Sequence, residues 1–264
     1  MFILSLLTLI ACNSKKEDTS IEEMDTASTE ETDTIETDTD DTDTEIPPGN
    51  SMVRVVHLSP DAPPVDIFLN GEPSGIENFA FKDTTGFIEL PSGSYSVAVA
   101  PTGAGFEAAL PITLEAELAS DGAYTAIAHG YLDTSVESNE FTLTPIVNDL
   151  IAPNTNTFKI QVIHAAAASV YAKVDLWNIT DPDNAMPLIP DFDYGESITT
   201  ELPTGVAFVL GIDIDADSAP DAVFDVPDSL SGFVTVYAIN DVNGQPSLLV
   251  HFEDGTNAEL TPRR

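Results

Sequence analysis

The distribution of apolar and polar positions beyond residue 50 predicts strands. Short runs rich in Val, Ile, Phe and Tyr alternate with turns rich in Gly, Pro and Asp, and no stretch sustains a helical period. Such spacing is typical of β-sandwiches and barrels. Asn243-Gly244 lies between the apolar runs 233–239 and 247–252, and Asn70-Gly71 repeats the same turn signal. Both dipeptides supply the positive-φ positions of tight hairpins. We therefore expect an all-β fold.

Four blocks of this pattern occur twice in the same order, which indicates an internal duplication. Offsets of 107 to 112 residues are too long for a solenoid repeat and suit a sandwich. The sequence predicts two tandem immunoglobulin-like antiparallel β-sandwich domains at residues 51–150 and 158–264, the second divergent. Pro153, Asn154 and Asn156 interrupt any strand between them. The paired blocks are 52–57 with 159–164, 65–68 with 174–177, 89–93 with 201–205, and 122–128 with 232–238.

The first copy carries a recognisable signature. Residues 53–63 read Val-Arg-Val-Val-His-Leu-Ser-Pro-Asp-Ala-Pro, Val65-Asp66 follows, and residues 90–95 read Leu-Pro-Ser-Gly-Ser-Tyr. This combination resembles the domain of unknown function family 4397. The resemblance implies an exported protein of bacteria or archaea with tandem β-sandwich copies, and the family has no established biochemical activity. The second copy has Ala-Ala-Ala-Ala-Ser at 165–169 in place of the loop 58–62, so a function of that loop would be confined to the first copy.

The N-terminus has the pattern of a lipoprotein signal. Residues 2–11 are apolar or small, a run too short to cross a bilayer core of about 30 Å. Leu9-Ile10-Ala11-Cys12 resembles the lipobox of bacterial lipoproteins, which implies that a signal peptide of residues 1–11 is removed and that Cys12 is lipidated. Cys12 is the one cysteine of the chain, and the alternative role for it is a buried free thiol.

The composition of residues 12–50 predicts an acidic, disordered tether. The segment alternates Asp or Glu with Thr, has almost no large apolar residue, and holds 14 of the 45 acidic residues. Such a composition cannot form a core. A solvated spacer is the favoured interpretation, with cation buffering as the alternative. The formal charge of −37 opposes nucleic-acid binding, which depends on Lys and Arg.

These features together predict a location at the bacterial cell envelope. The chain would be lipid-anchored and extracytoplasmic, with its membrane contact made through the N-terminal lipid. Asn13 replaces the Asp that commonly retains lipoproteins at the inner membrane, which favours the outer membrane or cell surface. An envelope protein or a polysaccharide is the expected partner.

Each copy pairs a histidine with a downstream aspartate, His57 with Asp66 and His164 with Asp175. Strand alternation places each histidine on the same face as its apolar neighbours, so both should point inward. A buried ring needs a partner for each nitrogen, which the aspartate or the following loop can supply. A structural role is favoured over a metal or catalytic role, because one His and one carboxylate fall short of a closed metal site.

Asp213, Asp215 and Asp217 resemble the beginning of a calcium-binding loop, with Asp221 and Asp225 nearby. An EF-hand loop needs Gly and Glu where this sequence has Ser218 and Phe224. Alternation with Ile212, Ile214 and Ala216 instead predicts a strand with an acidic outer face. Weak calcium binding stays an alternative, and no other cofactor is expected.

The chain lacks a Gly-x-Ser-x-Gly elbow, a His-Glu-x-x-His motif and a glycine-rich phosphate loop. We therefore expect a structural, adhesive or binding protein and not an enzyme. The alternative is a glycan-directed protein, a carbohydrate-binding module or a polysaccharide hydrolase. Its binding surface would be built from aromatic residues at loops or strand ends, for which the candidates are Phe106, Tyr131, Tyr171, Trp177 and Tyr194.

Overall fold

A computed structural model describes residues 49–133, 135 and 139–263 of the chain. Cys12, the predicted signal peptide and all but the end of the predicted tether lie outside these residues. The described part is all-β apart from three short 3-10 helices, so the predicted fold class is confirmed. Within it, no helix has the length and apolar character that a bilayer span requires.

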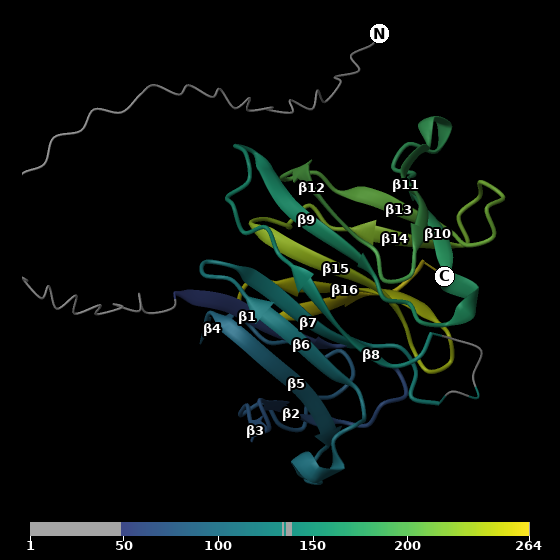
Figure 1. Cartoon of the computed structure of the whole chain (residues 1–264). Helices are drawn as coiled ribbons and strands as arrows, with labels where there is room; N and C mark the ends of the chain where they lie inside the picture. The colour runs from purple at the N-terminus through teal and green to yellow at the C-terminus, as the bar shows by residue number, and fades with distance from the viewer. Residues whose placement is uncertain (1–48, 134, 136–138, 264) are drawn as a thin grey trace, which may run out of the picture. The chain divides into compact units, whose positions relative to one another are not determined.

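The first copy consists of two four-stranded sheets (Figure 1). Their strand orders are β4-β1-β7-β8 and β3-β2-β5-β6. Only β1 and β7 pair in parallel, with Arg54 opposite Thr125. The strands are β1 (Asn50–His57), β2 (Val65–Leu69), β3 (Glu72–Pro73), β4 (Ile88–Pro91), β5 (Gly93–Pro101), β6 (Thr113–Leu118), β7 (Ala123–His129) and β8 (Thr142–Val147), with the 3-10 helix η1 (Phe106–Ala108) between β5 and β6.

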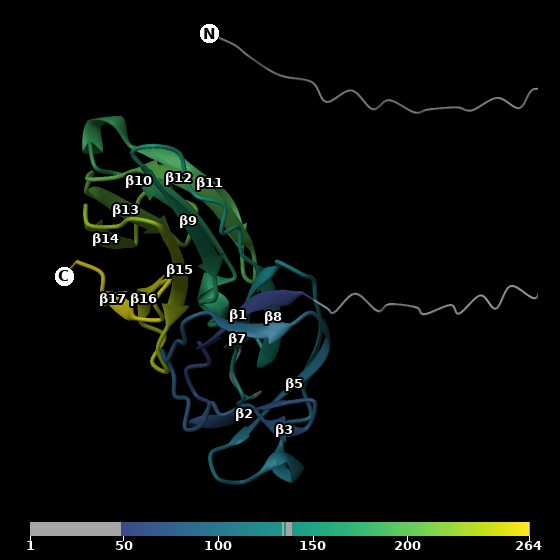
Figure 2. The same cartoon turned by 90° about the vertical axis from the view of Figure 1, so that its left-hand side faces the viewer.

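The second copy repeats this topology and adds one strand, β17, beside β16 (Figure 2). Its sheets have the orders β12-β9-β15-β16-β17 and β11-β10-β13-β14, and β9 again pairs in parallel with β15, Gln161 opposite Thr235. The predicted duplication is thereby confirmed. The strands are β9 (Thr157–His164), β10 (Lys173–Asn178), β11 (Met186–Asp193), β12 (Ser197–Pro203), β13 (Phe208–Asp213), β14 (Ala222–Val226), β15 (Phe233–Asn240), β16 (Pro246–Phe252) and β17 (Asn257–Leu260), with η2 (Ser169–Tyr171) and η3 (Pro182–Asn184).

The turn predicted at Asn70-Gly71 forms as expected, whereas the predicted hairpin at Asn243-Gly244 forms with a five-residue loop in which Gly244 but not Asn243 has positive φ. Asn70 and Gly71 have φ values of 52° and 83° and connect β2 to β3, and Gly244, with φ of 77°, lies in the turn between β15 and β16. Left-handed backbone of this kind is steeply disfavoured for residues other than Gly and Asn. These residues therefore determine the register of the two hairpins.

Each sandwich has its own apolar core between its two sheets. Val65, Ile67 and Val99 form the first core together with Phe141, and Val55 packs against it. Ile160, Val234 and Phe224 belong to the second, larger core. The inward faces of β1 and β9 are thus the ones that strand alternation predicts.

The opposite faces of β1 and β9 are also buried, because the two copies pack against each other there. Val56 and Ile127 of the first copy form one apolar cluster with Ile163, Tyr237 and Leu249 of the second. The strand β15 is consequently buried along its whole length. Residues from 49 onward form one compact unit in place of two separate bodies.

Polar side chains complete this contact between the copies. The Arg54 guanidinium, 0% exposed, donates through Nε to the Thr125 hydroxyl and through Nη2 to the Thr235 hydroxyl, and it stands 4.6 Å from the centre of the Phe87 ring. Gln161 accepts a hydrogen bond from the Asn148 amide at 2.7 Å. Polar positions on the second face of a strand therefore face the other copy here and are shielded from solvent.

Candidate functional site

The two histidines singled out in the sequence end β1 and β9, and both are 1% exposed. Nδ1 of His57 accepts the backbone N–H of Ser59 at 3.3 Å, and Nδ1 of His164 accepts that of Ala166 at 3.4 Å. Nε2 of His164 bonds the Tyr171 carbonyl at 2.7 Å. Burial lowers the pKa of both imidazoles. Each ring contacts the loop that follows its strand.

The two aspartates do not contact the histidines but hold other loops. Asp66 accepts the backbone N–H groups of Asn78 at 2.9 Å and Gly103 at 2.8 Å, and the bond from Gly103 is the main cause of its lowered pKa. Asp175 accepts the N–H of Asp191 at 2.6 Å. Asn78 and Asp191 both have positive φ, near 52° and 53°. The equivalent aspartates thus bond backbone segments of positive φ, a loop in the first copy and an irregularity of β11 in the second, and neither His–Asp pair is assembled into one site.

We expect His164→Ala to lower the free energy of unfolding by about 2 kcal/mol, because it leaves the buried Tyr171 carbonyl without its hydrogen bond. His57→Ala should cost less, since Nε2 of His57 has no hydrogen-bond partner among the described residues. Urea denaturation of the two variants measures the difference. Unchanged stability together with a lost binding activity would contradict the structural role of these residues.

The acidic segment after β13 forms a turn, so the strand predicted over residues 212–217 is wrong beyond Asp213. Asp213 is 1% exposed, and its carboxylate accepts the N–H groups of Ala216 at 2.9 Å and Ser218 at 2.8 Å. Both of these residues have positive φ. These local bonds of the Asp213 carboxylate compete with the backbone hydrogen bonds of the sheet. The strand therefore ends at Asp213.

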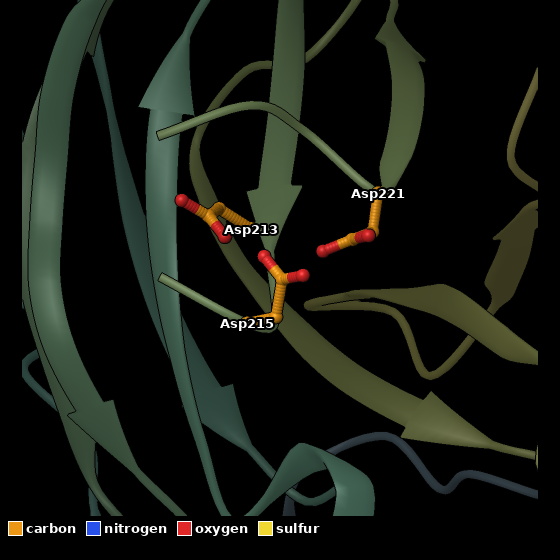
Figure 3. A group of neighbouring side chains, drawn as sticks. All are labelled: Asp213, Asp215 and Asp221. Atoms are coloured by element: carbon orange, nitrogen blue, oxygen red, sulfur yellow. The ribbon is translucent and has the colours of Figure 1, made fainter. Parts of the chain in front are cut away.

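Three carboxylates converge at this turn (Figure 3). Oxygen atoms of Asp213, Asp215 and Asp221 all lie within 4.8 Å of one another. Asp217 is not part of the group, because its carboxylate accepts the N–H of Ala219 at 2.8 Å. Carboxylate oxygens are the ligands that Ca²⁺ prefers. However, Asp213 and Asp221 already accept backbone hydrogen bonds, and a calcium ion would compete with them.

Weak calcium binding at this turn stays a prediction. Because a ligand that binds only the folded state stabilises it, calcium at concentrations above its dissociation constant should raise the melting temperature. Asp215→Asn should abolish the increase, and Asp217→Asn, outside the group, should preserve it. A melting temperature independent of calcium in the parent protein would exclude the site.

The aromatic residues proposed for glycan stacking do not form one surface. Tyr131 and Tyr171 are 5% and 6% exposed, and the Tyr171 hydroxyl donates to the Gly244 carbonyl at 2.7 Å. Phe106 is 43% exposed and packs against Phe68, with the ring centres 5.6 Å apart. Among the described residues, Phe106 is the one aromatic side chain that is largely exposed.

Two further histidines lie between the copies, and the sequence interpretation passed over them. Nδ1 of His129 and the Tyr194 hydroxyl are 2.5 Å apart, and Nε2 of His251 bonds the Thr85 carbonyl at 2.9 Å. Burial lowers the pKa of both imidazoles to about 4. His251 follows the apolar run 248–250, and this position in a buried strand is the signal that could have singled it out.

Comparison with known proteins finds a family model that matches part of the chain. Residues 51–176 match the family model described as Domain of unknown function (DUF4397). The DUF4397 match begins in β1 and ends in β10, so it includes all strands of the first sandwich and the first two of the second. It contains both His–Asp pairs and ends before the acidic turn. The curated proteins contain no match.

Two solved structures are similar at low TM-scores. One is CBMbc (family CBM26) from Eubacterium rectale Amy13K in complex with maltoheptaose, with 11% identity, 76% of this chain and 96% of that chain covered, and a TM-score of 0.22. The other is the Bacillus anthracis TIE protein, with 14% identity, coverage of 82% and 44%, and a TM-score of 0.20. At these TM-scores neither structure bears on what this chain binds.

Proposed function

We propose that this protein is a lipid-anchored, extracytoplasmic module of the bacterial cell envelope, in which the two sandwiches act as one rigid body with a structural, adhesive or binding role. The observation that carries the proposal is the buried contact between the copies. A flexible pair of domains would expose the outer faces of β1 and β9, whereas here Val56 and Ile163, which lie on those faces, are 0% and 2% exposed. A rigid body presents its surfaces at a constant spacing.

Ion pairs at the edge of this contact support the same conclusion. Lys82 of the first copy lies 2.6 Å from the Glu259 carboxylate of the second, and Lys159 lies 2.7 Å from Asp149, which precedes the second copy. Exposed pairs add little stability by themselves. Their value here is positional, because the Lys82–Glu259 pair joins the two copies and opposes sliding of one over the other.

The anchor is supported by the short apolar run followed by Leu9-Ile10-Ala11-Cys12. The mass of the mature N-terminus tests it: we expect a chain that begins at a lipidated Cys12 and partitions into detergent. Cys12→Ser should carry no lipid and should keep residues 1–11, with its fold intact. An unmodified Cys12 in the mature protein would overturn the anchor.

The partner class is tested separately with the full chain as bait. A structural or adhesive role predicts capture of an envelope protein, and the binding should weaken when salt screens the acidic surface. Retention on immobilised polysaccharide with no protein partner would replace this role by the glycan-directed alternative.

A further inference from the structure

The second sandwich contains an apolar cavity between its two sheets. Its volume is about 230 Å³, and every one of its lining side chains is apolar except that of Thr200. Both sheets contribute: Val162 and Val236 from one, Leu176 and Leu210 from the other. A close-packed core leaves few voids larger than a water molecule. A space of this size with almost no polar group is therefore a departure from ordinary packing.

The cavity is open on one side and closed on the other. Its open side lies at β11 and β12, the edge strands of the two sheets, where Leu188 is 46% and Ile198 is 40% exposed although both line the cavity. On the other side, the C-terminal segment covers the gap, because Leu260 lines the cavity and the Arg263 N–H donates to the Val223 carbonyl at 2.7 Å. A ligand can thus enter between β11 and β12.

Longer edge strands in the second copy build this entrance. The strands β11 and β12 have 8 and 7 residues, whereas their counterparts β3 and β4 have 2 and 4. The first copy has a comparable cavity of about 190 Å³, but Glu115, Glu117 and Tyr95 are among its lining residues. The almost wholly apolar lining is therefore particular to the second copy and does not follow from the fold.

We propose that this cavity binds the alkyl chain of an amphiphile with a neutral or cationic head group. An occupant of the interior can make almost no hydrogen bond, so it must be hydrocarbon. The volume lies below the 300–1,000 Å³ of most drug-sized ligand pockets, which favours a single chain over a fused ring system. Asp191 and Asp193 lie at the end of β11 and Glu196 directly precedes β12, so even with Lys173 paired to both aspartates three carboxylates face one ammonium group, and an anionic head group would be repelled at this end of the entrance.

Calorimetric titration of the full chain with decyl probes below their micelle concentrations tests the proposal. We expect decanol and decyltrimethylammonium to bind with similar affinity and to raise the melting temperature, and decanoate to bind at least tenfold more weakly. Thr200→Phe should reduce decanol affinity at least tenfold, because the ring fills the entrance. Thr199→Phe is the matched control: it lies on the same exposed strand but does not line the cavity, so affinity should be unchanged.

The melting temperatures of both variants without ligand show whether the fold is kept, and Ile198→Asp provides a second way to block the entrance with a charge. Absence of binding by every decyl probe, or equal affinity in the two Thr→Phe variants, would overturn the proposal. Preferential binding of decanoate would overturn the head-group assignment. The test is independent of Cys12 and of any envelope partner, so its failure would leave the proposed function in place.

Discussion

Replacing Ile127 with alanine is expected to lower the free energy of unfolding by about 3 kcal/mol, within the 2–5 kcal/mol typical of a buried Ile→Ala change. Ile127 is 2% exposed and belongs to the apolar cluster that joins the two copies. Because the truncated side chain leaves a cavity between the copies, both copies should lose stability. The single tryptophan, Trp177 in the second copy, makes this measurable.

Urea denaturation followed by Trp177 fluorescence and by circular dichroism is the measurement. The two transitions of Ile127→Ala should move together, since the mutation in the first copy destabilises the unit that contains the probe. Ile151→Ala, at a position that is 76% exposed, is the control and should change stability by less than about 0.5 kcal/mol. A Trp177 transition that does not move would mean that the copies unfold independently, and the rigid-body proposal would fail with it.

The fold could be predicted from the sequence because alternation and turn chemistry are local signals. Val53, Val55 and His57 share a face on any strand, and Asn-Gly specifies a tight turn wherever the flanking runs pair. The duplication then gave the number of sandwiches. The equivalence of β1 and β9 follows from these signals together, but the parallel pairing of each with its partner strand, in sheets predicted to be antiparallel, does not.

The contact between the copies could not be predicted in the same way. Arg54, Thr125 and Gln161 look like solvent-facing positions, because a polar second face is what a half-exposed strand shows. Arg54 bonds Thr125 of its own copy and Thr235 of the other, and Gln161 bonds Asn148, so polar side chains that look solvent-exposed in the sequence are buried here. One signal was present: the run Phe-Val-Thr-Val-Tyr-Ala-Ile at 233–239 barely alternates, which is typical of a strand buried on both faces.

The candidate site residues illustrate a second limit. Sequence spacing suggested that His57 and Asp66 act together, but the chain between them turns, and each side chain finds a backbone partner of its own. Similarly, periodicity predicted that the strand continues past Asp213, but the Asp213 carboxylate closes a turn there. The pattern gives no information on such local bonds between side chain and backbone. An Asp side chain that closes a turn bonds the backbone N–H groups next to it. The alternation of apolar and polar residues does not reveal such bonds.

Because its histidines are buried, the protein should lose stability on acidification at pH values well above those at which carboxylates titrate. His129 and His251 are 5% and 0% exposed, and burial lowers the pKa of each to about 4, against about 6.5 in an unfolded chain. Between these values the unfolded state binds a proton that the folded state does not. The stabilisation is therefore complete above pH 6.5 and is lost as the pH falls toward 4.

The expected slope is at most about 1.4 kcal/mol per pH unit for each histidine between pH 5 and 6, or nearly 3 kcal/mol per pH unit for His129 and His251, and His57 and His164, whose pKa burial also lowers, add to it. The pKa of Asp66 is lowered below its usual value. Protonation of Asp66 therefore changes the stability only in more acidic solutions and does not contribute to the slope between pH 5 and 6. Urea denaturation at pH 5, 6 and 7.5 gives the slope.

His129→Gln separates this effect from a general acid sensitivity, because glutamine keeps a polar side chain near the Tyr194 hydroxyl but cannot titrate. The slope should fall by about 1.4 kcal/mol per pH unit in this variant, whatever the change in absolute stability. A slope that is unaltered by His129→Gln would show that His129 is already protonated in the folded state. The interface would then have to hold an imidazolium beside a tyrosine hydroxyl whose own pKa is raised by burial, with no carboxylate bonded to the ring.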